Sequence, residues 1–207
     1  MQQEKLGDWL DRLGSAAPTP GGGGATALAA STAAALVEMV VNLTVGKTAY
    51  AEHEPYVRPI GVEARALRER ALELVAEDQA AFDVVMAAYG LPRDSAEDKA
   101  ARDAAIQDAT AAAARPPMRV AQVAGRVIEL AAALPGRSNR TVLSDVGVAA
   151  SLAVAALESA AINVEVNLGA LKDQGVRAEL RQELDKYLGT GQLGREIVTN
   201  VRQGIAG

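Results

Sequence analysis

Alanine dominates several long stretches of this chain that contain no proline, and 44 of the 207 residues are alanine. Aromatic residues make up only 3% of the chain. This composition is typical of a helix-rich protein. No segment alternates apolar and polar residues over a convincing length, as a half-buried strand would. We therefore expect an all-α protein, an up-and-down bundle of long Ala-rich helices that forms a single domain.

Prolines and glycines divide the chain into the expected helices. Four glycines in a row at 21–24 cannot hold a stable helix, so we expect a loop there. Ser95 resembles a helix N-cap, and Arg115-Pro116-Pro117 is expected to break a helix. The expected helices span Lys5–Leu13, Ala25–Gly46, Pro59–Tyr89, Lys99–Ala114, Met118–Leu134, Ser144–Leu171 and Arg177–Asn200.

Composition excludes several classes of function. The chain has no cysteine, and its single histidine, His53, cannot build a histidine cluster, so we expect no metal site. A net charge of −5 and a pI near 5.0 argue against non-specific binding to nucleic acid or to an anionic membrane. The first residues, MQQEKLGDWL, carry charge where a signal peptide would be apolar. We therefore expect a cytoplasmic protein.

Asp78 interrupts the apolar stripe of the expected helix 59–89, because steps of four lead from Leu74 to Asp78 to Phe82. Burial raises the pKa of a carboxyl group, and a carboxyl that stays protonated near neutral pH is able to act as a general acid or base. The alternative is that the stripe drifts and that Asp78 is a solvated edge residue beside Glu77.

The expected helix 144–171 carries polar side chains along one face. Asp145, Asn163 and Asn167 lie there among small residues at steps of three and four. The two amides are able to hydrogen-bond a heterocycle. Alternatively, they bond a neighbouring helix, and Asp145 is an acid of the first turn that the helix dipole favours.

The glycine run opens a helix, so free backbone N–H groups at Gly21, Gly22 and Gly23 are able to cradle an anionic or carbonyl group. The run is not a P-loop, because no Gly-Lys-Ser/Thr follows, and no strand precedes it as in a Rossmann fold. Lys47, just past the next helix, is a candidate partner for a ligand carboxylate, although lysine at a helix C-terminus also suits the dipole.

Several motifs occur together in an order that points to one family. They are Pro18-Thr19-Pro20-Gly21-Gly22-Gly23; Glu38-Met39-Val40 followed by Thr44, Gly46 and Lys47; Asp78 with Ala81-Phe82; Leu91-Pro92; Ser144-Asp145 with Val148-Ala149-Ala150; and Asn163-Val164 with Asn167-Leu168. From Leu6 to about Leu171, the chain resembles the formiminotetrahydrofolate cyclodeaminase and methenyltetrahydrofolate cyclohydrolase family, which includes the C-terminal domain of formiminotransferase-cyclodeaminase.

The resemblance implies a single cyclodeaminase-like helical domain over residues 1–207 that forms a homodimer. It implies a tetrahydrofolate derivative as substrate, no cofactor beyond it, and neither nucleic acid nor membrane as partner. The implied enzyme is formiminotetrahydrofolate cyclodeaminase, which closes a formimino group into methenyltetrahydrofolate with loss of ammonia. The alternatives are methenyltetrahydrofolate cyclohydrolase, which opens that ring with water, and a non-catalytic folate-binding or dimerisation module.

The resemblance also assigns roles to residues. The family's catalytic aspartate falls on Asp78, by its Asp-x-x-x-Phe context. Two positions depart from the family pattern: Gly24 stands where serine is common, and Thr141 stands where asparagine is common. Each change removes a side-chain group able to bond the substrate; the alternative is that the backbone N–H of Gly24 and the hydroxyl of Thr141 replace those bonds. The implied substrate-binding residues are Gly21, Gly22, Gly23, Lys47, Asn139, Asp145, Asn163 and Asn167, with Lys47 a candidate for the glutamate tail.

Overall fold

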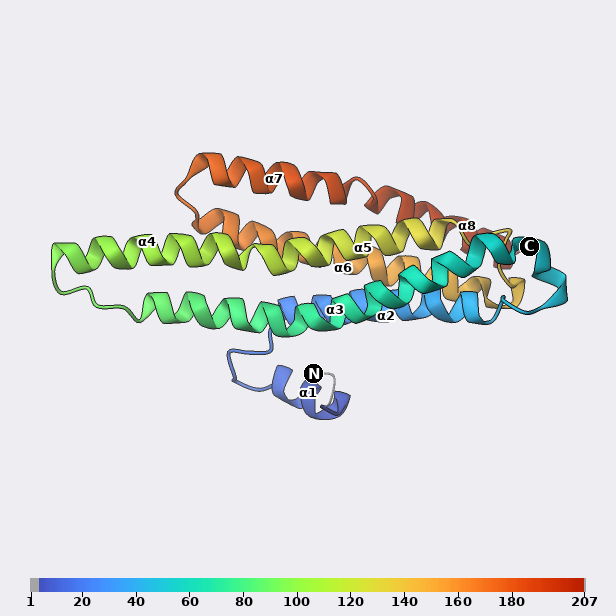
Figure 1. The fold of residues 1–207 in the computed structure, drawn as a ribbon, viewed down its shortest axis with the longest axis horizontal. Helices are drawn as coiled ribbons and strands as arrows, with labels where there is room; N and C mark the ends of the chain where they lie inside the picture. Colours follow the sequence, from blue (N-terminus) through green and yellow to red (C-terminus); the bar gives the residue numbers. More distant parts are fainter. Residues whose placement is uncertain (1–3, 207) are drawn as a thin grey trace.

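The structure, a computed structural model, describes residues 4–206, and every regular element in that range is a helix (Figure 1). This confirms the expected all-α helical bundle. The α-helices are α1 (Leu6–Leu13), α2 (Gly22–Asn42), α3 (Glu54–Tyr89), α4 (Ala96–Ala113), α5 (Arg115–Ala132), α6 (Leu143–Ala170), α7 (Gln174–Leu188) and α8 (Gly191–Ala206), and short 3-10 turns η1 (Thr48–His53) and η2 (Arg140–Val142) precede α3 and α6.

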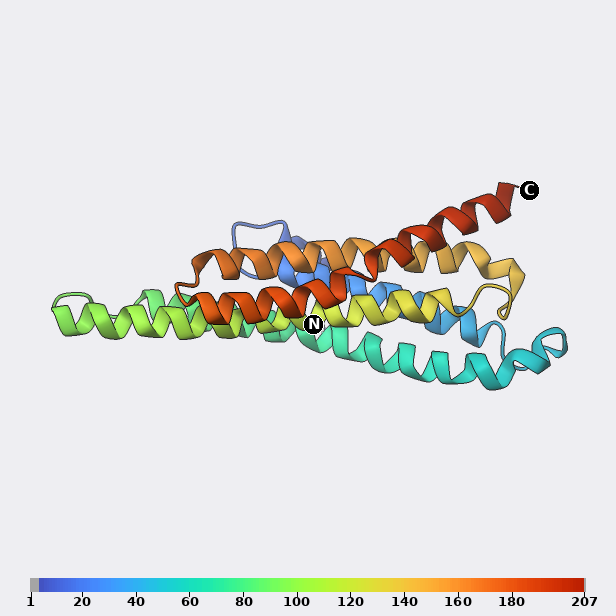
Figure 2. The ribbon, with the colours of Figure 1, turned by 90° about the horizontal axis from the view of Figure 1, so that it is seen from above.

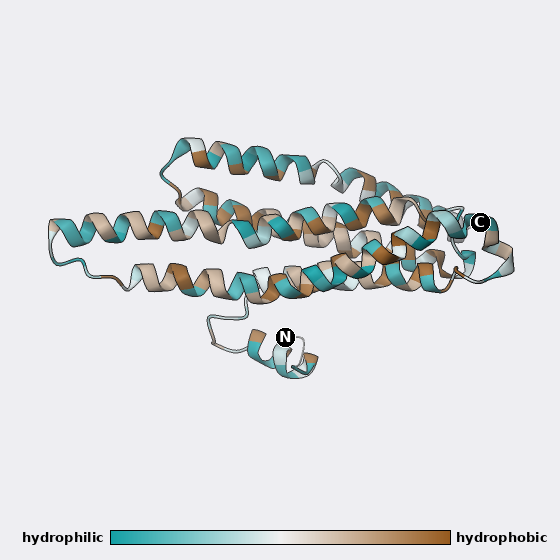
Figure 3. Ribbon diagram, in the orientation of Figure 1, coloured by the Kyte–Doolittle hydropathy of each residue, from teal (hydrophilic) through white to brown (hydrophobic). Residues whose placement is uncertain are grey.

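Four helices, α2, α3, α5 and α6, form the centre of the bundle, with α2 packed against the other three. Their buried sides consist largely of small side chains such as Ala30, Val37, Ala150 and Val164. Small side chains let helix backbones approach closely. The helices α7 and α8 lie along α5 and α6 (Figure 2), and α7 is mostly hydrophilic (Figure 3).

The hairpin of α3 and α4 extends past the end of the central helices (Figure 1). Ala88, Ile106 and Ala109 form a small apolar cluster there, separate from the main core, with Val85 packed against it. Ser95 caps α4 as expected, because its side chain accepts from the N–H of Asp98 while the Asp98 carboxylate accepts from the N–H of Ser95.

The helix α4 ends and α5 begins at Arg115-Pro116-Pro117 as expected, but α5 starts at Arg115 rather than at Met118, and the two helices keep one direction. The helices α4 and α5 run end to end in both views (Figures 1 and 2). Ala114 between them keeps a helical conformation, with φ −71° and ψ −19°. Both prolines lie in the first turn of α5, where proline's lack of an N–H is tolerated.

The glycine run forms the first turn of α2 instead of a loop, which corrects a second expectation. Gly21 is the N-cap, and the helix begins at Gly22, whose carbonyl oxygen accepts from Thr26 Oγ1 at 2.7 Å. A side chain on Gly24 would lie 3.5 Å from both Trp9 of α1 and Val75 of α3. Packing against neighbouring helices therefore overrides the low helix propensity of glycine.

Two further boundaries differ from the expected ones. The helix α3 begins at Glu54 rather than at Pro59, so Pro59 lies inside the helix. Proline has no N–H to donate to the carbonyl four residues earlier, but Pro55 and Pro59 are both exposed, so water is able to reach that carbonyl. The expected helix 177–200 is divided into α7 and α8 near Thr190, whose Oγ1 donates to the carbonyl oxygen of Tyr187 at 2.8 Å. The Asp173 side chain caps α7.

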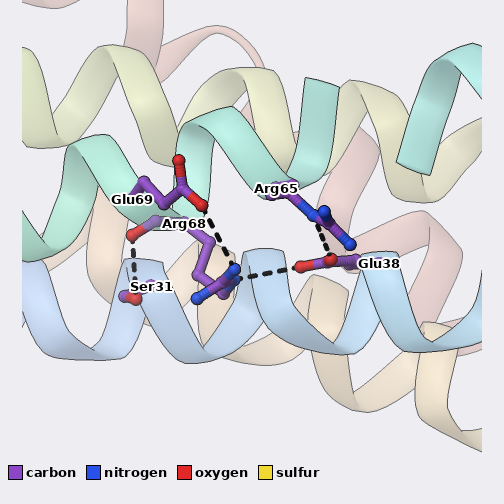
Figure 4. Close-up of polar contacts among 5 residues, drawn as sticks. All are labelled: Ser31, Glu38, Arg65, Arg68 and Glu69. Atoms are coloured by element: carbon purple, nitrogen blue, oxygen red, sulfur yellow. Dashed lines mark hydrogen bonds and ion pairs between the residues drawn. The ribbon is translucent and has the colours of Figure 1, made fainter. Parts of the chain in front are cut away.

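A buried ion pair joins α2 to α3 (Figure 4). Glu38 is only 9% exposed, and it accepts from Arg65 Nε at 2.7 Å and from Arg68 Nε at 3.0 Å. The Arg68 carbonyl oxygen also accepts from Ser31 Oγ at 3.1 Å. Burial alone would raise the pKa of Glu38, but the hydrogen bonds from both arginines outweigh it and lower the pKa. The carboxylate therefore stays ionised and ties the two helices together.

The helix α2 and the segment Arg140–Ala170 are long and apolar enough to span a membrane, judged by length and composition alone. In each, 56% of the apolar window is buried inside the bundle. Core helices of soluble proteins have the same properties, so the central position of α2 and α6 accounts for their apolar character.

Candidate active site

A pocket of about 380 Å³ lies where the N-terminus of α2, the second half of α3, the α4–α5 junction and the last third of α6 meet. Its volume lies in the range of small-molecule sites. The apolar part of the wall includes Phe82, Val85 and Val166. The polar part includes Asp78, Asn163 and Asn167, and Gly21 and Gly22 also line the pocket, so five of the site residues predicted from the sequence share one cavity.

Asp78 lies against the first turn of α2. Gly23 is required there, because a Cβ at this position would overlap the Asp78 carboxyl group. Burial raises the pKa of Asp78, while the backbone N–H of Gly24 acts in the opposite direction by hydrogen-bonding the carboxylate. Asp78 is half-buried and has a raised pKa, so the alternative of a fully solvated edge residue does not hold.

The N-terminus of α2 gives this part of the pocket hydrogen-bond donors. The first turn of a helix leaves backbone N–H groups without helical partners, here at Gly22, Gly23 and Gly24. These groups and the helix dipole favour negative charge beside them. The Gly24 N–H hydrogen-bonds the Asp78 carboxylate, so the donor that faces the pocket beside this carboxyl is the N–H of Gly22. A carboxyl group and an N–H donor in one place are suited to proton transfer in a reaction that places negative charge on an oxygen.

The amides of α6 are held against their own helix. Asn163 Nδ2 donates to the carbonyl oxygen of Ser159 at 2.9 Å, and Asn167 Nδ2 donates to that of Asn163 at 2.9 Å. Asn167 Nδ2 also reaches the Ala113 carbonyl oxygen at 3.5 Å, so the expected bond to a neighbouring helix is present in weak form. Within residues 4–206, the hydrogen bonds of both amides use their nitrogens and leave Oδ1 available.

Three residues proposed from the sequence lie at the opposite end of α2 and α6. Lys47 is exposed beyond the C-terminus of α2. Asn139 lies just before η2, and Asp145 is half-buried in the first turn of α6, which follows η2. The 21 residues of α2 span roughly 30 Å. One chain therefore brings Asp78, the glycines and the α6 amides together and does not bring Lys47, Asn139 or Asp145 to them.

Asn139 is buried and joins two distant segments of the chain. Its N–H donates to Thr44 Oγ1 at 2.9 Å, and its Nδ2 donates to the Leu43 carbonyl oxygen at 3.1 Å. Its Oδ1 accepts from the N–H and the hydroxyl of Thr141 at 3.1 and 2.9 Å. Thr141, one of the two departures from the family pattern, thus belongs to this junction between the end of α2 and the start of α6.

Sequence reasoning missed some polar residues. Thr110 of α4 lines the pocket and is only 4% exposed, but its hydroxyl lies in an alanine-rich run that gives no sign of a cavity. Glu38 had a clearer signal, because it is a lone charge between Val37 and Val40 in a helix expected to pack on several faces.

A family model provides an independent comparison. The model of formiminotransferase-cyclodeaminase matches residues 5–186. The chain belongs to this family. The resemblance seen in the sequence is thereby confirmed, and the relatives below confirm the expectation of an enzyme.

Relatives of this member of the formiminotransferase-cyclodeaminase family carry two different names. Methenyltetrahydrofolate cyclohydrolase from Methylorubrum extorquens is 42% identical over 203 residues, which are 98% of each chain. Formimidoyltransferase-cyclodeaminase from Sus scrofa is 29% identical over 183 residues, which are 88% of this chain and 34% of that protein. The crystal structure of formiminotetrahydrofolate cyclodeaminase from Thermotoga maritima is 28% identical, with a TM-score of 0.88 over 100% of this chain and 99% of that one.

Proposed function

We propose that the protein is a methenyltetrahydrofolate cyclohydrolase. The 42% identity to an enzyme of that name over 98% of both chains supports this reaction, whereas the animal cyclodeaminases are 26% to 29% identical. The comparison therefore favours the alternative over the cyclodeaminase that the sequence alone suggested first. The observation that carries the chemistry is the pocket carboxyl of Asp78, with its raised pKa and its place on the first turn of α2.

The first step is the addition of water. In the substrate, one positively charged carbon bridges two folate nitrogens. Water forms a bond to that carbon, and the Asp78 carboxylate accepts a proton from the water as the bond forms. The carbon becomes tetrahedral and carries a hydroxyl group, whose oxygen lies near the N–H of Gly22 in the pocket wall.

The second step opens the ring. One C–N bond breaks, and the protonated Asp78 donates its proton to the departing nitrogen. The hydroxyl group loses its proton, and its oxygen becomes the carbonyl of a formyl group on the other nitrogen. One water is consumed, one proton is released, and Asp78 returns to its ionised form.

The cyclodeaminase reaction is the second candidate, supported by the Thermotoga maritima structure of that name. In this reaction the folate nitrogen that does not carry the formimino group attacks the formimino carbon. Asp78 would accept the proton of that nitrogen and deliver it to the amine that leaves as ammonia.

The test follows the absorbance of methenyltetrahydrofolate with purified protein, at a pH where uncatalysed opening is slow. We expect decay with the wild type and a loss of roughly 10²- to 10⁴-fold in Asp78→Asn, whereas Asp83→Asn, an exposed acid on the same helix, keeps full activity. If the protein forms methenyltetrahydrofolate from formiminotetrahydrofolate with release of ammonia, and methenyltetrahydrofolate itself does not decay, the second candidate is the reaction. If the protein catalyses neither reaction, both candidate functions are rejected.

We also propose a cytoplasmic homodimer, as the family resemblance implied. Val148, Ile162 and Val166 are 49%, 62% and 69% exposed along α6, and a second copy covering them would bury apolar surface. Light scattering should give twice the chain mass of 21.4 kDa, and Ile162→Glu should shift the protein toward monomer. A monomeric wild type would contradict this proposal.

A further inference from the structure

The α4–α5 junction leaves a backbone carbonyl without its helical partner. In a continuous helix, the Ala113 carbonyl would accept from the N–H of residue 117, but that residue is proline and has no N–H. Ala113 and Pro117 both line the pocket. The Asn167 amide nitrogen reaches this oxygen only at the long distance of 3.5 Å.

The neighbouring α6 wall adds two further acceptors. Because both amide nitrogens are turned to carbonyls of α6 itself, Asn163 and Asn167 present their side-chain oxygens. Asn163 Oδ1 lies 3.7 Å from the position that a Cβ on Gly22 would take, so it faces the N-terminal turn of α2 across the pocket wall. This side of the pocket is therefore rich in oxygen acceptors.

The two sides of the pocket differ in hydrogen-bond character. The Asp78 side holds N–H donors and the proton-transferring carboxyl, and the α6 side holds acceptors. Gly22 lies beside Asn163 and Gly23 beside Asp78, and consecutive Cα atoms are about 3.8 Å apart. One bicyclic ring is thus able to contact both sides at once.

A tetrahydropterin ring has a matching asymmetry. Its pyrimidine edge carries two adjacent donors, the 2-amino group and the N3–H. Its reacting nitrogens lie toward the other end. We propose that the donor edge of the bound ring lies against Asn163 Oδ1, Asn167 Oδ1 and the Ala113 carbonyl, which directs the bridging carbon toward Asp78. This orientation rests on the proposed function for its ligand class and makes the α6 amides specificity-determining residues.

The experiment compares the dissociation constants of tetrahydrofolate and of its analogue with a methyl group in place of the 2-amino group. Calorimetry on the wild-type protein should show weaker binding of the analogue by roughly 10- to 100-fold. Asn167→Leu should bind tetrahydrofolate more weakly by a similar factor and lose most of the discrimination, because the acceptor is already gone. Asn167→Asp keeps an acceptor oxygen and should keep the discrimination. Asn42→Leu, on α2 outside this pocket, is the matched control.

The possible outcomes separate this inference from the proposed reaction. Equal binding of the two compounds by the wild type, or no binding of either, would overturn the orientation. The orientation would also be overturned if the preference for tetrahydrofolate over the analogue survived in Asn167→Leu and Asn163→Leu but disappeared in Asp78→Asn. In that case the 2-amino group would lie at Asp78 and the ring would have the opposite orientation. Discrimination that depends on the α6 amides, in a protein that does not hydrolyse methenyltetrahydrofolate, would support the orientation and reject the reaction.

Discussion

Gly23 lies buried behind the pocket and leaves no room for a side chain beside Asp78. In Gly23→Ala, the new methyl group would overlap the Asp78 carboxyl and push it from its place. Displacement of a catalytic group by about 1 Å lowers rates by roughly 10²-fold, so we expect a loss of that size in kcat. The matched control is Gly169→Ala on α6, outside the pocket lining, whose methyl group would have no neighbouring side chain within 4 Å. Equal activity in both variants would show that the carboxyl tolerates the shift.

The pKa of Asp78 also predicts how its removal affects stability. A carboxyl whose folded pKa lies above its unfolded value near 3.8 increasingly disfavours the folded state as pH rises above that unfolded value, and the effect is complete once pH exceeds the folded pKa. Asp78→Asn should therefore unfold at a urea concentration equal to or above that of the wild type at pH 7. The advantage should vanish as pH falls below about 3.8, where both side chains are neutral. A lower midpoint for Asp78→Asn at pH 7 would contradict the assigned shift.

The site residues differ in how far the sequence could reveal them. Asp78 was recognisable because an acid inside an apolar stripe breaks a local pattern. The role of Asn139 was not recognisable, because its partners Leu43 and Thr44 are more than 90 positions away. The unpaired carbonyl of Ala113 was not predictable either, because it is a backbone group whose position depends on how α4 and α5 are arranged end to end.

At the scale of elements, the Glu38 ion pair is the main polar tie between α2 and α3. Its lowered pKa means that the ionised form stabilises the fold above the unfolded value near 4.5, and that this contribution is lost as pH falls through the folded pKa. Glu38→Gln should lower the free energy of unfolding by about 1–3 kcal/mol at pH 7. The difference should shrink in urea titrations below pH 4.5.

The control for this ion pair is Glu69→Gln. Glu69 meets Arg68 only at 3.5 Å on the exposed side of α3. Its removal should change the free energy of unfolding by less than about 0.5 kcal/mol. If Glu38→Gln and Glu69→Gln changed the free energy of unfolding by similar amounts, burial of Glu38 would not increase the stabilisation that its ion pair provides.

Element types were predictable and several boundaries were not. Helical spacing identified α3, and the capping residues identified the start of α4. The errors at the glycine run, at Pro59 and at the start of α5 concern glycine and proline, whose local preferences gave way to context, whereas the division between α7 and α8 lies at Thr190. The glycines of α2 are helical because α1 and α3 pack against them, and Pro116 and Pro117 fit in a first turn that continues the preceding helix.

At the scale of the whole molecule, the protruding α3–α4 hairpin should open more readily than the centre. Its cluster of Ala88, Ile106 and Ala109 is small and separate from the main core, and local opening requires less free energy where few apolar contacts are lost. In hydrogen exchange, amides over residues 86–104 should exchange faster than those of α2 between Ala27 and Val40. Uniform protection along the whole bundle would contradict this expectation.

The small side chains at the centre of the bundle have a consequence for the entropy of folding. Alanine has no rotamers to lose, whereas burial of a leucine or isoleucine removes side-chain freedom worth about 0.5–1 kcal/mol. A core of residues such as Ala30 and Ala150 therefore gains less from burial of each side chain but also loses less freedom when it orders. Backbones held close by methyl groups leave few alternative packings, so the pocket walls formed by α2 and α6 should be more rigid than the wall formed by the α3–α4 hairpin.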